Sequence, residues 1–353
     1  MKKRQSILIL LLSLVLLLSG CGGNGGNQPA DGNNKENGNN ATVNNQEEAK
    51  DDKEESGYPV SWKENFEGTD VDFSVEEAPK KAISMSMATT EMMLALGLED
   101  QMVGTAFLEE DILPELKDAY DKVEVLSDKW PSYEVFMSKE PDFATGWPVP
   151  FTKRGIEHDK ITGEGVPIFI PNSFKEADAD LEMNFEDLLM YGKIFGKEEN
   201  AEKLVASQKE KLEKVKEKIK DLPEKSIFVF DSEDEQPFTV FEGYTTNVLN
   251  LIGCKNILAG KGSDQTWGNA SWEEIVAGNP ESIIVVDYGV SIRNTDDFDA
   301  KVEKIKANPM LKDVDAVKNN SFIRVKLSEI TPGVRTVDAL TRIAEEIHGV
   351  TLD

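Results

Sequence analysis

Histidine, cysteine and positive charge are all scarce in this sequence. Two histidines and two cysteines among 353 residues exclude a disulfide-built scaffold and supply too few ligands for a histidine-rich metal site. Lys and Arg number 39 against 66 Asp and Glu, which gives a formal net charge of −27. So acidic a chain is a poor candidate for sequence-independent binding to nucleic acid, and anionic lipid headgroups repel it. We therefore expect no resident metal, no cofactor and no nucleic-acid partner.

Familiar catalytic signatures are missing as well. The chain has no G-x-S-x-G nucleophile elbow, no Walker A loop and no H-E-x-x-H zinc motif. Its two histidines, His158 and His348, lie far apart in the sequence. These absences disfavour a secreted hydrolase, and we expect a binding protein rather than an enzyme.

The first twenty residues differ from the rest of the chain. Basic residues 2–4 precede an apolar run from Ile7 to Leu18 that is short for a membrane-spanning helix, and small residues follow. The Leu18-Ser19-Gly20-Cys21 run resembles the bacterial lipobox, in which the signal is removed and the cysteine carries lipid. We predict a lipoprotein signal peptide over 1–20 and a lipidated, palmitate-bearing Cys21 that anchors the protein at the extracytoplasmic face of the cell membrane. An ordinary signal peptide with a chance cysteine is the alternative.

Residues 21–57 are rich in Gly, Asn, Asp, Glu and Lys and contain almost nothing apolar. A segment of this composition buries too little surface to offset the entropy lost on ordering, so we expect a disordered tether. Cys254 is then the only other cysteine, and its apolar neighbours predict a core position rather than a reactive thiol.

Short apolar strands alternate with helical segments through the rest of the chain, which favours an α/β fold with mostly parallel sheets. A helix that reaches Phe195, with Asn184 as its candidate N-cap, is followed by an uninterrupted charged segment over 198–222 that Pro223 ends. We predict two Rossmann-like lobes over 58–197 and 223–353, bridged by this single long helix. The expected strands are Ala82–Met87, Met102–Thr105, Phe143–Thr145, Pro167–Ile170, Ser226–Phe230, Ser282–Val286 and Phe322–Val325.

A short pattern occurs once on each side of the long helix. Ser132-Tyr133-Glu134 and Ser271-Trp272-Glu273 are each followed, nine residues after the serine, by proline, an acidic residue and an apolar strand. Two similar lobes would produce this repeat, although common α/β turn chemistry could produce it by chance.

These segments, together with Pro79 to Gly104 and Asn308 to Ile323, resemble the class III substrate-binding proteins of ABC importers. That family binds iron-siderophores, haem and cobalamin between two α/β lobes. The resemblance extends over roughly 58–349 and implies a monomeric receptor that binds a small chelate. It also implies that the receptor delivers this ligand to an ABC permease and its ATPase.

The resemblance also implies one permease-docking acid on each lobe, and the matching residues are Glu134 and Glu273. Both follow a helix-capping serine by two residues, where a carboxylate also stabilises the helix end, so a structural role is the alternative. Glu274 has the spacing of a capping box and is expected to be structural.

The ligand is expected at the carboxyl ends of the strands, in the cleft between the lobes. For each candidate residue, an ordinary packing role is the alternative. Arg335 is expected at the start of a helix, where a positive charge is unfavourable beside the positive end of the helix dipole. This position favours a role in which Arg335 faces an anion. The candidate ligand-binding residues are Trp147, Arg335, Tyr244, Trp267, Met87 and Lys129.

The identity of the ligand is the open question. Arg335, Lys129 and Tyr244 favour a ferric siderophore, which is the first expectation. Trp147 and Trp267 suit a largely neutral corrinoid such as cobalamin, and haem would need Tyr244 or His158 as an axial ligand. A surface adhesin or interaction lipoprotein is the alternative outside this class.

Overall fold

The computed structural model describes residues 57–262, 265–288 and 298–351. The predicted signal peptide, the predicted lipidation site at Cys21 and almost all of the predicted tether lie outside these residues. Among the described residues, no helix is both long and apolar enough to cross a membrane.

The N lobe is built on a five-stranded sheet whose neighbouring strands all pair in parallel, in the order β5-β4-β3-β6-β7. Buried side chains fill both faces of its central strands, as expected for a parallel sheet covered by helices. The strands are β3 (Ala82–Ser84), β4 (Met102–Ala106), β5 (Val125–Ser127), β6 (Phe143–Thr145) and β7 (Ile168–Phe169). The helices are α1 (Met87–Ala95), α2 (Lys117–Tyr120), α3 (Tyr133–Met137), α4 (His158–Thr162) and α5 (Leu181–Phe195).

The C lobe contains a four-stranded parallel sheet in the order β11-β8-β13-β14 and a small antiparallel sheet, β12-β10-β9. The parallel strands are β8 (Lys225–Phe230), β11 (Cys254–Asn256), β13 (Ser282–Val286) and β14 (Phe322–Val325), and the antiparallel ones are β9 (Ser232–Glu233), β10 (Pro237–Val240) and β12 (Trp267–Asn269). The helices are α7 (Tyr244–Asn250), α8 (Trp272–Gly278), α10 (Phe298–Ala307), α11 (Asp315–Lys318), α12 (Leu327–Ile330) and α13 (Thr336–His348). The predicted α/β class with two lobes and mostly parallel sheets is confirmed.

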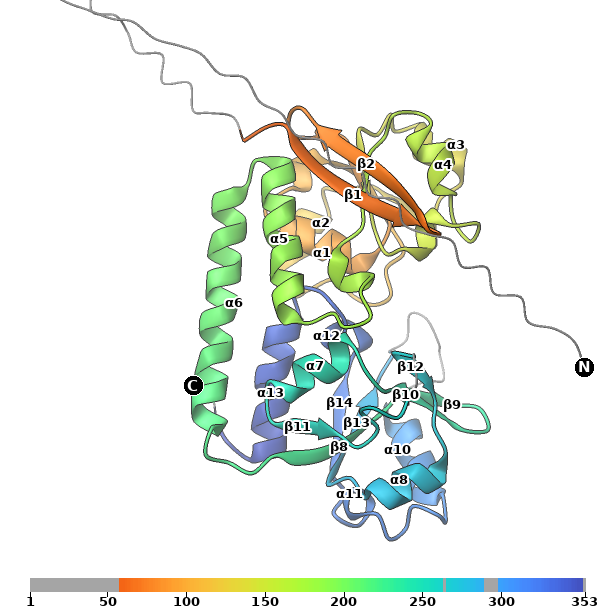
Figure 1. Cartoon of the computed structure of the whole chain (residues 1–353), viewed down its shortest axis with the longest axis vertical. Helices are drawn as coiled ribbons and strands as arrows, with labels where there is room; N and C mark the ends of the chain where they lie inside the picture. The colour runs from red at the N-terminus through yellow and green to blue at the C-terminus, as the bar shows by residue number, and fades with distance from the viewer. Residues whose placement is uncertain (1–56, 263–264, 289–297, 352–353) are drawn as a thin grey trace, which may run out of the picture. The chain divides into compact units, whose positions relative to one another are not determined.

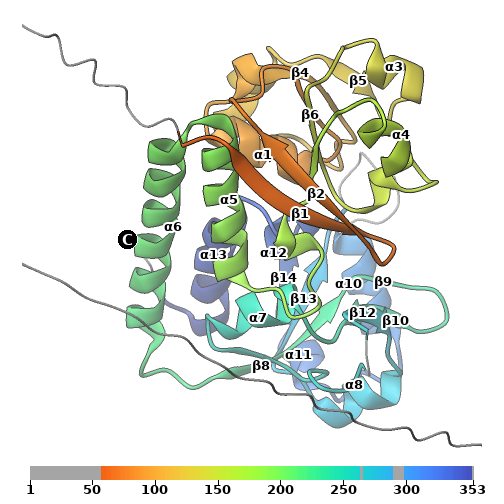
Figure 2. The same ribbon diagram turned by 45° about the horizontal axis from the view of Figure 1, so that its top comes forward.

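One helix, α6 (Glu198–Ile219), connects the lobes and runs beside α5 of the N lobe and α13 of the C lobe (Figures 1 and 2). At 1.5 Å per residue its 22 residues extend over about 33 Å. One face is apolar and buried, and the other carries Lys–Glu pairs three or four residues apart. The buried residues are Ala201, Val205, Leu212, Val215 and Ile219.

The repeated pattern forms the same local structure in each lobe. Ser132 and Ser271 cap α3 and α8, each accepting a hydrogen bond from a backbone N–H three residues on. The acidic residue after each proline accepts hydrogen bonds from the backbone at the start of a neighbouring strand, β3 in the N lobe and β8 in the C lobe. Asp142 accepts from the backbone N–H groups of residues 80 and 81, and Glu281 accepts from that of Ser226, all at 2.8–2.9 Å. The two lobes thus share a structural unit and not only a sequence pattern.

Two parts of the fold were not expected. An antiparallel hairpin, β1 (Val60–Phe66) and β2 (Thr69–Val75), packs on the N lobe beside β7 (Figure 2). The predicted N-cap of α5 was wrong: Asp180 caps this helix, accepting from the N–H of Met183 at 2.9 Å. Asn184 instead lies inside the helix, where its side chain donates to the carbonyl of Gly333 in the C lobe at 3.1 Å.

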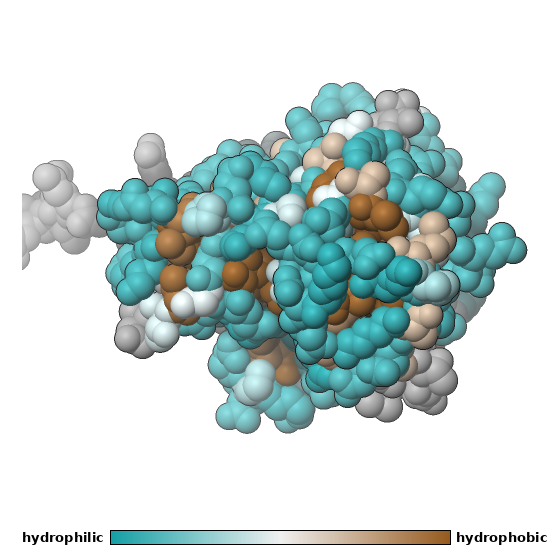
Figure 3. Space-filling view, turned by 90° about the horizontal axis from the view of Figure 1, so that it is seen from below, coloured by the Kyte–Doolittle hydropathy of each residue, from teal (hydrophilic) through white to brown (hydrophobic). Residues whose placement is uncertain are grey.

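Hydrophilic residues cover most of the face shown in Figure 3, and the hydrophobic patches on it are small and separated. Cys254 is fully buried and unpaired, and burial raises the pKa of its thiol to about 12. The predicted core position of this cysteine is confirmed.

Candidate binding site

A cavity of about 460 Å³ lies between the two lobes. The N lobe contributes Trp147, which follows β6, and a segment around Phe174, which follows β7. The C lobe contributes Tyr244 at the start of α7, Trp267 of β12 and the Thr331-Pro332 turn. The cavity therefore lies beyond the carboxyl ends of the N-lobe strands, where open parallel sheets bind ligands. Its volume is within the usual range for small-molecule sites.

Aromatic side chains line the cavity on both lobes: Trp147 and Phe174 on one, Tyr244 and Trp267 on the other. The ring centroids of Trp147 and Phe174 are 6.0 Å apart with an angle of 44° between their planes. On the opposite lobe, Trp267 stacks on Phe238 at 6.2 Å and 21°. The two lobes thus present aromatic surfaces to the same space, an arrangement suited to a flat ligand.

Two polar groups in the cavity wall are uncommitted. The Nε1 atom of Trp147 and the Oγ atom of Ser173 are buried and have no hydrogen-bond partner among the described residues. Leaving a buried donor unpaired costs about 1–3 kcal/mol, so these groups are available to a ligand or to water. Trp147 and Trp267 therefore lie where the sequence predicted, while their contact with a ligand stays a prediction.

Tyr244 also borders the cavity, but its hydroxyl is already used. The side chain is buried, and the hydroxyl donates to Oγ1 of Thr336 at 2.9 Å. Desolvation raises the pKa of this hydroxyl well above its usual value. Tyr244 is therefore part of the wall and is not poised as a phenolate ligand for iron.

Arg335 does not face the cavity, which differs from the expected anion-facing role. Its guanidinium is only 8% exposed and binds Glu91 of α1 through two hydrogen bonds of 2.6 and 2.7 Å. It also donates to the carbonyl of Asp111 at 2.7 Å and lies 3.2 Å from the Glu110 carboxylate. The positive charge of Arg335, which was expected to face a ligand, is neutralised by Glu91 and Glu110 of the N lobe.

Met87 and Lys129 are not among the residues that line the cavity. Met87 is the first residue of α1 and is fully buried in the core. Lys129 is exposed, beyond β5, and no side-chain ion pair is found for it within the described residues. Met87 was a candidate because it follows the first strand at a helix start, where backbone N–H groups can meet a ligand; it does begin α1, but its side chain lies in the core.

The acidic cluster around Arg335 was missed in the sequence. Glu91, only 2% exposed, also accepts a hydrogen bond from the backbone N–H of Leu113. Glu110 pairs with Lys326 of the C lobe at 2.7 Å. Burial, with Glu110 close by, raises the pKa of the Glu109 carboxyl to about 8. The available signal was the single acid in the otherwise uncharged stretch of residues 82–98.

The segment from Ile170 to Lys175 was also missed as a cavity wall. Two buried acids hold it in place. Asp187 of α5 accepts from the backbone N–H groups of residues 172 and 173, and Glu64 of β1 accepts from that of Ile170 at 2.9 Å. Glu64 also pairs with Lys175 at 2.6 Å. Desolvation raises the pKa of Asp187 to about 6. Two acids distant in sequence could not have been assigned to one loop by local patterns.

Glu134 and Glu273 are exposed in the first turns of α3 and α8. Hydrogen bonds from its own backbone N–H and from Ser132 lower the pKa of the Glu134 carboxyl. Glu274 forms the predicted capping box with Ser271 and is structural. Both candidate docking acids are thus free to meet a partner, while their role stays a prediction.

Within residues 57–262, 265–288 and 298–351, no group of three or more His, Cys, Asp or Glu side chains is arranged to hold a metal ion.

Two α/β lobes joined by one long helix, with an aromatic cavity between them, define a bilobed binding protein. The chain belongs to the periplasmic binding protein family, whose sequence profile matches residues 83–327.

Similar proteins agree with this assignment. The uncharacterized ABC transporter substrate-binding lipoprotein YvrC of Bacillus subtilis is 28% identical over 292 residues, which are 80% of this chain and 84% of the relative. The vitamin B12-binding protein of Pectobacterium atrosepticum is 26% identical over 225 residues, 62% of this chain and 76% of that protein. A crystal structure of a periplasmic binding protein from Veillonella parvula is 61% identical with a TM-score of 0.81, and the match covers 84% of this chain and 100% of that one. The resemblance to ABC-importer substrate-binding proteins, which are carriers and not enzymes, is confirmed.

Proposed function

We propose that this substrate-binding protein captures a corrinoid in the cavity between its lobes and delivers it to an ABC permease and its ATPase. The observation that carries the proposal is the aromatic cavity itself, with Trp147 on one lobe and Trp267 on the other. A flat, largely neutral macrocycle can stack between two such surfaces without needing a counter-ion.

The charges near the cavity support this ligand over a ferric siderophore. The siderophore expectation depended on Arg335, Lys129 and Tyr244, of which Arg335 binds Glu91 and Lys129 does not line the cavity. Lys175, which does line it, is neutralised by Glu64 at 2.6 Å. Arg335 and Lys175 are paired with acids and Lys129 does not line the cavity, so none of these three cations is available there to an anionic chelate.

Haem is less well matched than a corrinoid. Axial ligation needs a tyrosine or histidine that faces the cavity with a free ligating atom. The hydroxyl of Tyr244 is committed to Thr336, and His158 is not among the residues that line this cavity. The similarity to a vitamin B12-binding protein is a further support for a corrinoid.

Equilibrium dialysis of the full-length chain in mild detergent, against cyanocobalamin, haem and a ferric hydroxamate, tests the proposal. We expect cyanocobalamin to bind at least tenfold more tightly than the other two. Preference for the hydroxamate or for haem would replace the corrinoid with that ligand, and binding of none would exclude the chelate class.

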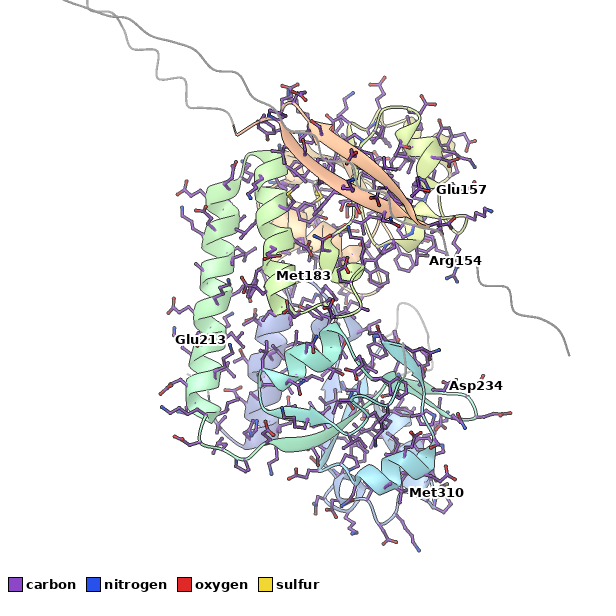
Figure 4. The ribbon with its side chains drawn as sticks, viewed as in Figure 1. Arg154, Glu157, Met183, Glu213, Asp234 and Met310 are labelled. Carbon is purple, nitrogen blue, oxygen red and sulfur yellow. The ribbon has the colours of Figure 1, made fainter. Side chains whose placement is uncertain are left out.

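We also propose that Glu134 and Glu273 dock the two lobes on the permease. They occupy equivalent first-turn positions on α3 and α8, and both are exposed. The paired change Glu134→Ala and Glu273→Ala should abolish corrinoid uptake by cells and leave affinity for the ligand unchanged. Glu213→Ala on the exposed side of α6 is the control (Figure 4). Lost affinity in the paired variant would show that the acids belong to the binding site.

We propose that the protein is retained at the outer face of the membrane by lipid on Cys21. The support is the lipobox-like run and the lipoprotein name of the B. subtilis relative. Mass spectrometry of the mature N-terminus should find a modified Cys21, and Cys21→Ser should release the protein into the medium.

A further inference from the structure

A second cavity of about 410 Å³ adjoins the aromatic one. We call it the side chamber. It is lined by the turn of the β1–β2 hairpin, the loop at 148–153, the beginning of α4, and Ile170 and Lys175. Pro148 and Lys175 line both cavities, so the two spaces share a wall. Figure 4 shows Arg154 and Glu157 close to the hairpin turn that closes the chamber.

The β1–β2 hairpin, which completes the chamber, lies outside the part of the chain that matches the family profile, because that match begins at residue 83. It is firmly attached to the N lobe. The indole of Trp62 donates to the carbonyl of Ile168 at 2.8 Å, and the 1%-exposed Glu64 binds both Ile170 and Lys175. The chamber is therefore a built part of the lobe.

The floor of the chamber is apolar and aromatic. Phe66, Phe151 and Ile170 line it and are nearly fully buried. The imidazole of His158 stacks on Phe66 with ring centroids 4.1 Å apart and planes 9° from parallel. A planar ring entering the chamber would meet surfaces of the same kind as those in the larger cavity.

One buried polar atom in the chamber is uncommitted. Nδ1 of His158 is buried and has no hydrogen-bond partner within the described residues. The neighbouring charges are largely compensated, because Lys175 pairs with Glu64 and Glu157 pairs with Lys160 at 3.2 Å. The remaining charges at the rim are of both signs, from Glu67, Lys153 and Asp159. The chamber thus suits a group that contains a flat ring, can hydrogen bond to an imidazole nitrogen and can meet charges of either sign at the rim.

We infer that the side chamber is a second subsite for the same ligand, which receives the ring-bearing nucleotide arm of a complete corrinoid while the macrocycle lies in the aromatic cavity. This inference rests on the proposed function. It adds that the protein distinguishes complete corrinoids from those without the arm, because only the former fill both spaces.

Cyanocobalamin and dicyanocobinamide, which lacks the nucleotide arm, form the matched pair of probes. Their dissociation constants are measured by equilibrium dialysis with the full-length chain and with three variants. His158→Ala removes the ring, His158→Phe keeps the stacked ring but removes the nitrogen, and Arg154→Ala changes an exposed residue that does not line the chamber. Circular dichroism checks that each variant is folded.

We expect the unmodified chain to bind cyanocobalamin about tenfold more tightly than cobinamide, the scale of one well-made hydrogen bond or ring contact. His158→Ala should reduce this preference to about twofold, His158→Phe should give an intermediate value, and Arg154→Ala should retain it. Equal binding of the two corrinoids by the unmodified chain would overturn the second subsite and leave the proposed function intact. A preference unchanged in both His158 variants would also overturn it, and failure of both corrinoids to bind would overturn the proposed function itself.

Discussion

The two lobes meet in two chemically different regions. In the aromatic cavity, polar atoms of Trp147 and Ser173 are buried and have no hydrogen-bond partner in the part of the chain that the structure describes. In the cluster around Arg335, the guanidinium is bound by Glu91, Asp111 and Glu110. Uncommitted groups are available to bind a ligand, whereas committed groups fix the lobes to each other. The buried Arg335 between the lobes is therefore better explained as part of the framework than as a ligand contact.

The largest expected effect comes from breaking the ionic region. Arg335→Ala would leave Glu91 buried without its partner, and removal of one member of a buried pair costs about 3–5 kcal/mol. Urea unfolding of the full-length chain measures this loss. Lys203→Ala, which removes an exposed pair with Glu199, should cost less than about 1 kcal/mol. If the Arg335 variant lost no more stability than the Lys203 variant, the cluster would not join the lobes.

A substitution in the aromatic cavity should lower the affinity of the protein for a corrinoid. Trp147→Ala removes one wall of the cavity and its free indole nitrogen, and we expect corrinoid affinity to fall by about 10- to 100-fold, as for a buried aromatic contact. Equilibrium dialysis measures the dissociation constant. Trp130→Ala is a suitable control, because Trp130 contacts Phe107 near Trp147 without lining the cavity. An equal loss in both variants would indicate general damage to the lobe.

The ionic region should also make stability depend on pH. Because burial raises the pKa of Glu109 to about 8 from a usual value of 4.5, the folded state holds this proton more tightly than the unfolded state. The contribution of Glu109 to stability is therefore fully present below about pH 4.5 and is lost as the pH rises through 8. Between pH 6 and 8 the slope is at most about 1.4 kcal/mol per pH unit. Glu109→Gln should flatten this dependence in urea unfolding, and an unchanged slope would contradict the assignment.

The smallest change in corrinoid affinity is expected from a substitution that disturbs Lys175, which lines both cavities. Glu64→Gln keeps the shape of the side chain but removes the ion pair with Lys175, and we expect corrinoid affinity to fall about threefold to tenfold with the fold intact. Asp72→Asn, on the exposed face of the same hairpin, should leave the affinity unchanged. An unchanged affinity in the Glu64 variant would show that Lys175 does not need this acid for its position.

Local patterns predicted the framework well. The Ser132 and Ser271 caps, and the β6, β13 and β14 strands, came directly from short-range signals such as capping side chains and apolar runs. Trp147 was a candidate because it follows the predicted 143–145 strand, whereas Trp267 was assigned to a loop and in the structure begins β12, a strand that was not predicted.

Pairing across long sequence distances could not be predicted in the same way. Arg335 and Glu91 are separated by 244 residues, and Glu64 and Lys175 by 111. An isolated charge next to a helix start looks the same in sequence whether it meets a ligand or a buried acid. The hairpin at 60–75 was missed although its inward and outward residues alternate, because the buried acid Glu64 interrupts the apolar face of β1.

A crystal structure of the full-length chain with cyanocobalamin is the direct test of corrinoid binding between the lobes. We expect the macrocycle between Trp147 and Trp267, with Arg335 still bound to Glu91. A ligand bound outside this cavity, or an Arg335 that has left Glu91 to contact the ligand, would contradict this expectation.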